Sequence, residues 1–458
     1  MTDLAQPERR FREVARGALE RQGTQAALAA ATGRLREARL SAWADLPDAE
    51  ALREQAHEVR MRAIDDLDRY LDEFEHAAVA AGATVHRAAT AAEARELVVG
   101  ICRDAGAQLV AKSKSMATEE IALNDGLEQA GIRAVETDLG EYILQLAGEH
   151  PVHIIAPAIE KTASQVAELL RGVDGIDVRP ELEDLTATAR RQLRQVFLDA
   201  DVGVTGVNFG IAETGSICLV TNEGNGRLVS SLPRVHVALM GIERVVPRLE
   251  DLPVLLKLLA RSGTGQRLTT YTTLITGPRR PGETDGPEQL HIVLLDNGRS
   301  GLRRGRYREM LACIRCGACL NVCPVYRRAG GGAYGPVYSG PMGAVLAPLL
   351  VGLERAPALP HASSLCGACT DSCPVKIPLH ELLLDLRRDL VSEGVASRAE
   401  RLGFWLWSWA WSSPRGYRAS TGLARLGQRF GRLAGPGRAW SAGRELPRLA
   451  PRRFRDRR

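Results

Sequence analysis

The chain has 458 residues, of which 45% are hydrophobic and 25% charged, and its formal net charge is +5. A chain of this length and composition can bury a substantial core and is expected to form two or three domains. Residues 1–17 lack the apolar segment of a secretory signal, and no eighteen apolar residues run together, so we expect a cytoplasmic protein without membrane spans.

The first segment, residues 1–81, is predicted to be helical. Between Glu8 and Ala81, alanine, leucine and arginine recur at helical spacing, and breaks in the pattern fall near Gly33 and Pro47. We therefore expect two long helices that precede the first globular domain.

Residues 82–298 are predicted to form an α/β domain, because short β-branched runs alternate there with amphipathic stretches. Such alternation is typical of a parallel sheet covered on both faces. The expected strands include residues 84–85, 109–110 and 152–155, and the expected helices cover residues 91–105, 118–130, 164–171, 181–198 and 252–261.

The second half of this domain is richer in strands. Residues 202–240 are broken at Thr214-Gly215 and at residues 222–226, and glycine turns of this kind favour hairpins with antiparallel strands. Further strands are expected near residues 269–275 and 291–295, and the domain is expected to end near Gly298.

One loop in this domain is a possible anion site. Lys112 and Lys114 follow an expected strand and precede a helix start that Ser115 can cap, so their charges and free N–H groups could hold a carboxylate or a phosphate. Glu213, beside Gly215, could act as a catalytic carboxylate or could be a turn residue. The competing interpretation is a solvated loop with two exposed lysines.

The motif with the most specific chemistry lies further along the chain, in residues 299–397. Seven of the nine cysteines fall there, in two runs that each close on Cys-Pro. The first run matches the spacing C-x2-C-x2-C-x3-C-P, in which three thiolates hold one iron–sulfur cluster and the fourth cysteine holds the other. We call the set expected at the first cluster the cluster-1 cysteines: Cys313, Cys316, Cys319 and Cys373.

The set expected at the second cluster, here the cluster-2 cysteines, has three members: Cys323, Cys366 and Cys369. This set is one thiolate short, and the spacing of the first run places Ser363 at the missing position. The second site could therefore hold a three-iron centre, or a four-iron centre whose fourth ligand is Ser363, water or a group from a partner.

Other uses of these cysteines fit less well. A structural zinc takes four tetrahedral ligands, which seven cysteines in this arrangement supply badly, and disulfides are not expected without a secretory signal. Between the two runs, residues 330–335 match G-x-G-x-x-G but follow no expected strand, so we predict no flavin or nicotinamide site. Helices near residues 343–353 and 380–391 make this a mainly helical two-cluster domain.

The last segment, residues 398–458, is rich in tryptophan and arginine, with fourteen arginines after residue 400 against two acidic residues. Such a segment could lie at a membrane interface with anionic lipid, or it could dock on the cluster domain or a partner subunit. A nucleic-acid partner is not expected, because the segment contains no recognisable binding module.

The cysteine strings, together with residues 112–116 and 206–215, resemble the family of lactate utilization protein B, the iron–sulfur subunit of a bacterial three-protein system for L-lactate oxidation. The resemblance covers nearly the whole chain. It implies a LUD domain, similar in fold to the sugar-phosphate isomerase and CoA-transferase class, followed by a ferredoxin-like domain with two [4Fe-4S] clusters. It also implies a second iron–sulfur protein and a LUD-only protein as partners.

The resemblance implies a subunit that relays electrons one at a time from lactate oxidation toward a soluble, membrane-bound or quinone-linked acceptor, and that need not be catalytic alone. Two alternatives remain open. The chain could serve a different 2-hydroxy acid, such as glycolate, or it could be a redox or anion sensor.

Overall fold

The computed structural model describes residues 8–335, 337–396, 398–429, 450 and 452. The chain divides into two compact units, Met1–Arg388 and Asp389–Arg458. The boundary between them falls inside helix α18, Leu379–Ser392.

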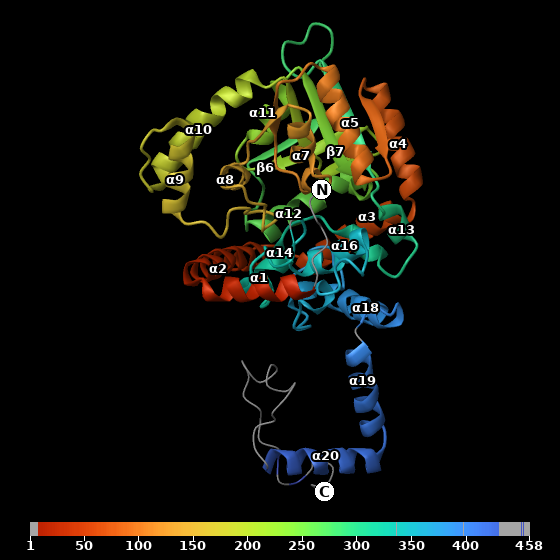
Figure 1. The fold of residues 1–458 in the computed structure, drawn as a ribbon. Helices are drawn as coiled ribbons and strands as arrows, with labels where there is room; N and C mark the ends of the chain where they lie inside the picture. The colour runs from red at the N-terminus through yellow and green to blue at the C-terminus, as the bar shows by residue number, and fades with distance from the viewer. Residues whose placement is uncertain (1–7, 336, 397, 430–449, 451, 453–458) are drawn as a thin grey trace. The chain divides into compact units, whose positions relative to one another are not determined.

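The centre of the first unit is a six-stranded sheet in which every pair of neighbouring strands is parallel, in the order β1-β10-β7-β4-β2-β3. Figure 1 labels its strand β7. The register places Val110 opposite Val202, and Val202 opposite Val235. Its strands are β1 (Thr84–Ala88), β2 (Leu109–Lys112), β3 (Arg133–Glu136), β4 (Val202–Gly206), β7 (Val235–Gly241) and β10 (Gln289–Leu295). The predicted α/β architecture with a mainly parallel sheet is therefore confirmed.

Helices cover both faces of this sheet, because alternate residues of each strand point to opposite sides. Val110 packs into one apolar core with α5 and α7, whereas Ala111 packs into another with α8, α9, α10 and α11. The helices of the domain are α5 (Ala91–Asp104), α6 (Met116–Glu120), α7 (Leu123–Gln129), α8 (Leu139–Ala147), α9 (Ala163–Asp174), α10 (Leu182–Asp199), α11 (Asn225–Ser231) and α12 (Leu252–Gly263), of which α12 packs into a different apolar core.

A second, four-stranded sheet has the order β8-β5-β6-β9. Its strands are β5 (Phe209–Ile211), β6 (Ser216–Thr221), β8 (Val245–Val246) and β9 (Tyr271–Ile275). β5 and β6 form the antiparallel hairpin predicted at Thr214-Gly215. The second predicted turn, at residues 222–226, is wrong as a hairpin: Gly224, with a φ of 80°, leads directly into α11 instead.

Two further predictions about this domain are wrong. Residues 152–155 form a loop and not a strand, and the predicted helix over residues 118–130 is two short helices, α6 and α7. Ala122, at a φ of 50°, interrupts the helical path between them. The strand β3 has no counterpart among the predicted strands.

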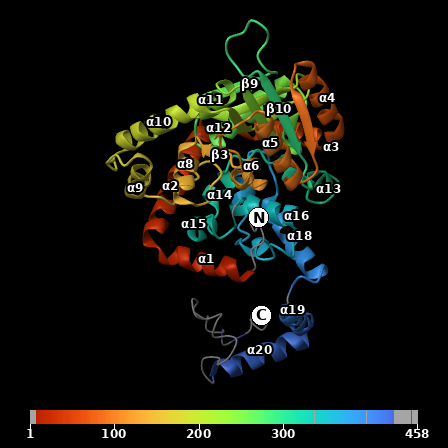
Figure 2. The ribbon, with the colours of Figure 1, turned by 45° about the horizontal axis from the view of Figure 1, so that its top comes forward.

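The N-terminal segment forms four helices rather than the two predicted: α1 (Glu8–Glu20), α2 (Gln22–Ala44), α3 (Ala49–Asp65) and α4 (Leu67–Ala80). Breaks fall at Arg21, Asp48 and Asp66, and Asp48 adopts a left-handed conformation. Helices α1 and α2 run beside the cysteine-rich segment, as both ribbon views show (Figures 1 and 2). They therefore belong to the body of the first unit.

The cysteine-rich segment is mainly helical, as predicted, and shares one continuous apolar core with α2, α3 and α12. Its helices are α13 (Arg299–Arg303), α14 (Ala318–Val322), α15 (Tyr326–Ala329), α16 (Gly340–Val351), α17 (Ala368–Asp371) and α18. The cysteine-rich segment also contains short 3-10 turns at Arg308–Ala312 and Leu359–His361. Two further 3-10 turns, Ile242–Arg244 and Leu249–Asp251, lie in the α/β domain.

The second unit contains α19 (Arg398–Trp411) and α20 (Pro414–Arg429). The tryptophans and leucines of α19 are exposed within the described part of the chain. None of the helices described has both the length and the apolarity that a membrane crossing requires.

Candidate functional site

The four cluster-1 cysteines come together although they belong to two separate motifs. They line one small cavity, whose other walls include Ile154, Met342 and Ile377. Cys373 reaches this cavity from the second motif, about fifty residues beyond the first, as the crossed spacing rule predicts.

The three cluster-2 cysteines also lie near one another. Burial raises the pKa of Cys369 to about 11, and repulsion from Cys323 and Cys366 adds to this effect. Cys369 in turn raises the pKa of Cys319, so the two sets of cysteines are adjacent.

The two motifs share one local conformation. Arg315, just before Cys316, and Leu365, just before Cys366, both have left-handed φ angles, of 59° and 55°. The glycines that follow, Gly317 and Gly367, also have positive φ angles, of 76° and 82°, and each begins a short helix that carries the next cysteine. Because non-glycine residues rarely adopt this conformation, its repetition indicates that both loops are shaped for the same purpose.

Ser363 takes the place that Cys313 has in the first motif. The N–H group of Arg315 donates to the sulfur of Cys313 at 3.4 Å, and the N–H group of Leu365 donates to the hydroxyl oxygen of Ser363 at 3.1 Å. The side chain two residues before each left-handed position is therefore held by the same contact, with oxygen in place of sulfur.

The donor set fits iron–sulfur clusters. Burial raises the pKa of Cys316 and Cys373 to about 12, so these thiols stay protonated until a metal compensates their charge. Backbone N–H groups of Arg315, Tyr326 and Ile377 point at sulfur atoms at 3.4 to 3.5 Å, and such hydrogen bonds help to set cluster potentials. Across the described residues, no three His, Cys, Asp or Glu side chains gather closely enough to hold a single metal ion.

Arginines surround the cluster-1 cysteines. Arg39 donates to the carbonyl oxygen of Ser372 at 3.1 Å and Arg244 to that of Cys313 at 3.1 Å. The fully buried Arg60 donates to the carbonyl oxygens of Leu311 and Ala312, just before Cys313. The cluster-2 cysteines have an acidic neighbour instead. A hydrogen bond with Ser364 lowers the pKa of Cys366, and the negative charge of Asp371 opposes this effect.

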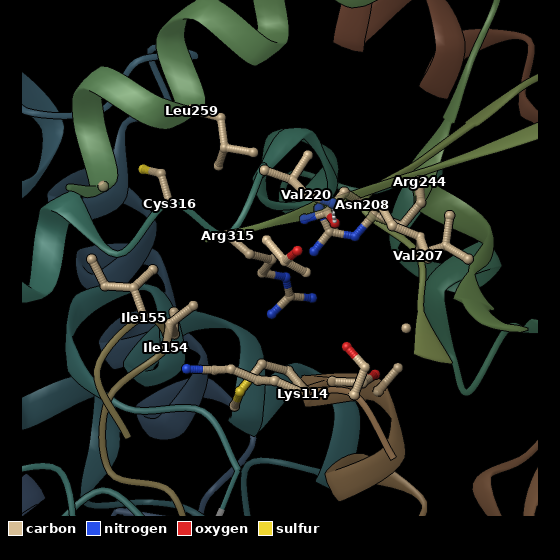
Figure 3. Close-up of a pocket in the computed structure, with 18 of the residues that line it drawn as sticks. Lys114, Ile154, Ile155, Val207, Asn208, Val220, Arg244, Leu259, Arg315 and Cys316 are labelled. Atoms are coloured by element: carbon tan, nitrogen blue, oxygen red, sulfur yellow. Dashed lines mark hydrogen bonds between the residues drawn. The ribbon is translucent and has the colours of Figure 1, made fainter. Parts of the chain in front are cut away.

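A second cavity, of about 280 Å³, borders the first, and we call it the strand-end cavity. Its walls include the segments that follow β2, β3, β4, β7 and β10, residues of β6 and α12, and Arg315, Cys316 and Tyr338 from the cysteine-rich segment. Arg315 and Cys316 line both cavities, so the strand-end cavity and the cluster-1 cysteines share a wall. Figure 3 shows Lys114 and Arg315 reaching into it, with Ile154, Val207 and Leu259 around them.

Part of the charge in this cavity is internally balanced. Glu243 lies 2.7 Å from Arg299, 3.3 Å from Arg315 and 3.5 Å from Arg244. Burial opposes the charge of Glu243, but these three arginines lower its pKa to about 2. Arg299 also forms an ion pair with Glu120. Glu243, Glu120 and the three arginines therefore form one buried ionic network at the wall of the cavity.

The structure separates the three residues predicted as an anion site. Lys114 lines the strand-end cavity. Lys112 is fully buried, 2.5 Å from Glu136 and 2.7 Å from Asn124, because it ends β2 and points into the core beneath the loop. Glu213 lies in another depression, where its carboxylate accepts the N–H of Leu249 at 3.0 Å. The alternative of a solvated loop with two exposed lysines is wrong, since Lys112 is fully buried and the ammonium nitrogen of Lys114 is also buried.

Several residues of the site were not found from the sequence. Arg39 and Arg53, which donates to the carbonyl oxygen of Cys373, come from N-terminal helices that carry no motif. Arg244 follows a strand in the α/β domain. Two residues of the strand-end cavity could have been found from the sequence. Arg315 lies between Cys313 and Cys316, and Asn208 lies in residues 206–215, which carry part of the family resemblance.

Three family models match successive parts of the chain: a LUD domain at residues 71–295, a 4Fe-4S dicluster domain at residues 309–377, and the C-terminal region of lactate utilisation protein B at residues 389–458. The fold and site thus define a LUD-domain protein with a 4Fe-4S dicluster domain.

Curated relatives give the family. The chain is 45% identical over 455 residues to lactate utilization protein B of Bacillus velezensis, covering 97% of this chain and 96% of that protein. It is 46% identical to the protein of the same name from Shouchella clausii, covering 94% of this chain and 92% of that protein. The chain belongs to the lactate utilization protein B family, as the resemblance predicted.

A solved structure also matches: a DUF162 family protein from Deinococcus radiodurans, with 18% identity, a TM-score of 0.26, and coverage of 50% of this chain and 98% of that chain. A likeness at this level supports no inference.

Proposed function

We propose that this protein is an electron-transfer subunit in lactate utilisation, which relays single electrons through two iron–sulfur clusters when a partner oxidises L-lactate to pyruvate. The observation that carries this proposal is the meeting of the cluster-1 cysteines, from two motifs, around one cavity. The names of the relatives and the dicluster family model support it further. Clusters exchange one electron at a time, so they suit the relay once another centre has split the electron pair.

The cluster-1 cysteines would hold a [4Fe-4S] cluster, and the cluster-2 cysteines would hold the second. For the second cluster we propose the four-iron form with Ser363 as the fourth ligand. The hydrogen bond from the N–H of Leu365 to Ser363, which repeats the contact at Cys313, supports this assignment.

The proposed partners are a second iron–sulfur protein and a LUD-only protein, because these accompany the family in its lactate-oxidising system. A different 2-hydroxy acid, such as glycolate, would need the same relay and stands as the second candidate source of electrons. The six-stranded parallel sheet also supports a fold like that of the sugar-phosphate isomerase and CoA-transferase class.

We further propose that the C-terminal unit contacts the inner face of the membrane, near the electron acceptor. Trp405, Trp407 and Trp409 on α19 are between 56% and 68% exposed within the described residues, and arginines follow on α20. Indole rings and arginine side chains together favour the interface of an anionic bilayer.

The relay is tested with anaerobically purified full-length protein, by iron and sulfide analysis and by EPR. We expect about eight irons per chain, as two four-iron clusters require. EPR signals of reduced clusters should appear when L-lactate and the partner subunits are added together. Glycolate is tested in parallel as the electron source.

Two variants sharpen this test. Cys316→Ala should lose one cluster, whereas Cys102→Ala, which changes a buried cysteine on α5 outside the motifs, should keep both. Protein without iron would refute the proposal. Turnover of L-lactate by this chain alone would make it an enzyme, and clusters that the lactate-fed complex cannot reduce would favour a sensor.

A further inference from the structure

The strand-end cavity lies where parallel α/β sheets bind their ligands. Ser113 to Ala117 follow β2, Gly206 ends β4 and leads to Asn208, and Glu243 and Arg244 follow β7, so the carboxyl ends of neighbouring strands all meet at the cavity. Ligands of open α/β sheets bind outside this edge, in the crevice between the loops. The cavity is therefore placed by the topology of the sheet and is more than a gap between two domains.

Two cations in this cavity lack a complete set of partners. Within the described residues, the Nζ atom of Lys114 and the Nε and Nη1 atoms of Arg315 are buried and have no hydrogen-bond partner. The side chain of Arg315 is only 10% exposed, and among the residues described its one ion pair is the 3.3 Å contact of Nη2 with Glu243. Its guanidinium carbon also lies 4.3 Å from the centre of the Tyr338 ring. Removing a cation from water costs several kcal/mol unless a counter-charge is present, so an anion would complete this site.

The acidic residues nearby supply that counter-charge only in part. Glu243 shares its charge among Arg299, Arg315 and Arg244, and within the described residues no carboxylate hydrogen-bonds to the Nζ atom of Lys114. Asp138 accepts the N–H groups of Gly140 and Glu141 at 3.1 and 3.3 Å, and Glu223 accepts the N–H of Leu139 at 3.0 Å. Burial raises the pKa of Glu141 and Glu223, which favours their neutral forms.

The size and lining of the cavity indicate a small organic anion. Its volume of about 280 Å³ lies just below the roughly 300–1,000 Å³ of pockets that enclose drug-sized ligands. Ile154, Val207 and Val220 form apolar parts of the wall, and these would suit a short alkyl group better than a bare phosphate. The planar guanidinium of Arg315 can bind a carboxylate through two hydrogen bonds, while Lys114 can hold a neighbouring oxygen.

We propose that the strand-end cavity binds a small 2-hydroxy or 2-oxo carboxylate, with the carboxylate on Arg315 and the C2 oxygen on Lys114, next to Cys316. The choice of this acid class rests on the proposed function in lactate utilisation. The binding site itself rests on the geometry of the cavity.

The position of the site couples binding to the redox state. Cys316 lines both cavities, so an anion held by Arg315 lies beside a ligand of the proposed first cluster. Reduction would add negative charge to this cluster, and a bound anion would make that reduction less favourable. By thermodynamic linkage, the reduced protein should bind the anion more weakly by the same factor. A tenfold difference in affinity corresponds to a decrease of about 59 mV in the potential of that cluster.

Calorimetric titration of the anaerobic holoprotein with L-lactate and with pyruvate tests the proposal. At least one of them should bind at least tenfold more tightly than propionate, which has the same carbon chain without the C2 oxygen. Lys114→Met should weaken this binding by about tenfold or more, Lys114→Arg should restore most of it, and iron content should stay unchanged. Lys161→Met, which removes a lysine paired with Glu149 outside the cavity, is the matched control.

Arg315→Met serves as a second variant, but it lies between two cluster ligands and can fail to load iron. The conclusion therefore depends on Lys114, which contributes no ligand. Equal binding of propionate, tighter binding of inorganic phosphate, or unchanged affinity in Lys114→Met would each overturn the proposal.

These outcomes are separable from failure of the relay. If lactate and pyruvate do not bind but the partner-fed complex still reduces the clusters, only the binding proposal fails. If the acids bind through Lys114 while the clusters are never reduced, the relay fails and the binding site remains.

Discussion

Arg53 on α3 donates two hydrogen bonds to the carbonyl oxygen of Cys373, from Nε at 3.1 Å and from Nη2 at 2.8 Å. Its charge also acts on the thiol of Cys373 and lowers the pKa of this group against the larger effect of burial. Helix α3 thus holds the loop of the second motif in place and brings a positive charge to the cluster-1 cysteines.

This contact predicts an effect on reduction potential. Replacing Arg53 with methionine removes a cation that stabilises the additional negative charge of the reduced cluster. We expect the potential of the cluster at the cluster-1 cysteines to fall by tens of millivolts, on the order of 1 kcal/mol for a partly buried charge. Potentiometric titration followed by EPR measures the change.

Arg69→Met is the control, because Arg69 is exposed on α4 and pairs with Asp66 and Glu73 away from the cysteines. Equal shifts in both variants would show that the loss of charge acts through the whole protein and not through the contact at Cys373.

The second prediction concerns Ser363. If its hydroxyl is the fourth ligand, Ser363→Ala should lose iron from the second cluster and give a three-iron signal in oxidised EPR spectra, whereas Ser363→Cys should retain four irons more firmly, because thiolate is the better ligand. Ser364→Ala is the matched variant, since this neighbouring hydroxyl hydrogen-bonds to Cys366. Iron loss in Ser364→Ala with none in Ser363→Ala would reassign the ligand.

These sites differ in how far the sequence predicts them. The cluster-1 cysteines could be grouped from spacing alone, because three of them lie within seven residues and the crossed fourth follows from the geometry of the motif. Lys114 could be found because a loop between a strand and a capped helix is a local pattern. The role of Lys112 could not, since its partner Glu136 lies on the next strand and only the parallel pairing of β2 with β3 brings them together.

The surroundings of the clusters depend on tertiary contacts that leave no local signal. Arg39 and Arg53 look like ordinary polar residues of amphipathic helices, and their roles depend on how α2 and α3 pack against a segment more than three hundred residues later. The apolar pattern predicts that these helices bury a face, but not which surface covers it.

A buried ionic network joins the α/β domain to the cysteine-rich segment and predicts a large effect on stability. Glu120 on α6 accepts two hydrogen bonds from Arg299, at 2.8 and 2.7 Å, and one from Tyr338 at 2.5 Å. Burial opposes its charge, but Arg299 holds the pKa of Glu120 below its usual value. Glu120→Gln leaves Arg299 under-compensated, and we expect a loss of about 3–5 kcal/mol in the free energy of unfolding.

Denaturant unfolding of the anaerobic protein measures this loss. Glu250→Gln breaks an exposed pair with Arg248 and should cost less than about 1 kcal/mol. Similar losses in the two variants would contradict a structural role for the buried network.

The fourth prediction is a pH dependence from His236 on β7. The ring is fully buried and lies 2.8 Å from the hydroxyl of Thr205, and burial lowers its pKa to about 3. The folded protein keeps this ring neutral, while the unfolded chain takes up a proton below a pH of about 6.5. Stability from this residue is therefore complete above that pH and falls as the pH decreases toward 3.

When the pH falls from 7.5 to 6, protonation of this residue in the unfolded chain should lower the free energy of unfolding by about 0.8 kcal/mol. His236→Gln removes the titration, so its stability should change less over this interval than that of the unmodified protein, as measured by denaturation midpoints. His76→Gln, at an exposed position on α4, should keep the original pH dependence. An unchanged slope in His236→Gln would show that the ring does not control it.

The last prediction tests the C-terminal unit. If α19 binds a membrane interface, the protein should sediment with vesicles that contain anionic phosphatidylglycerol and much less with neutral phosphatidylcholine, because arginines such as Arg415 and Arg425 on α20 add attraction of about 1 kcal/mol each. The double variant Trp405→Ser and Trp409→Ser should lose this binding, and added salt should weaken it by screening. Leu182→Ser changes an exposed leucine of the first unit and should have no effect. If sedimentation is the same with anionic and neutral vesicles, and the same for the double variant, α19 would instead be favoured as a docking surface for a partner subunit.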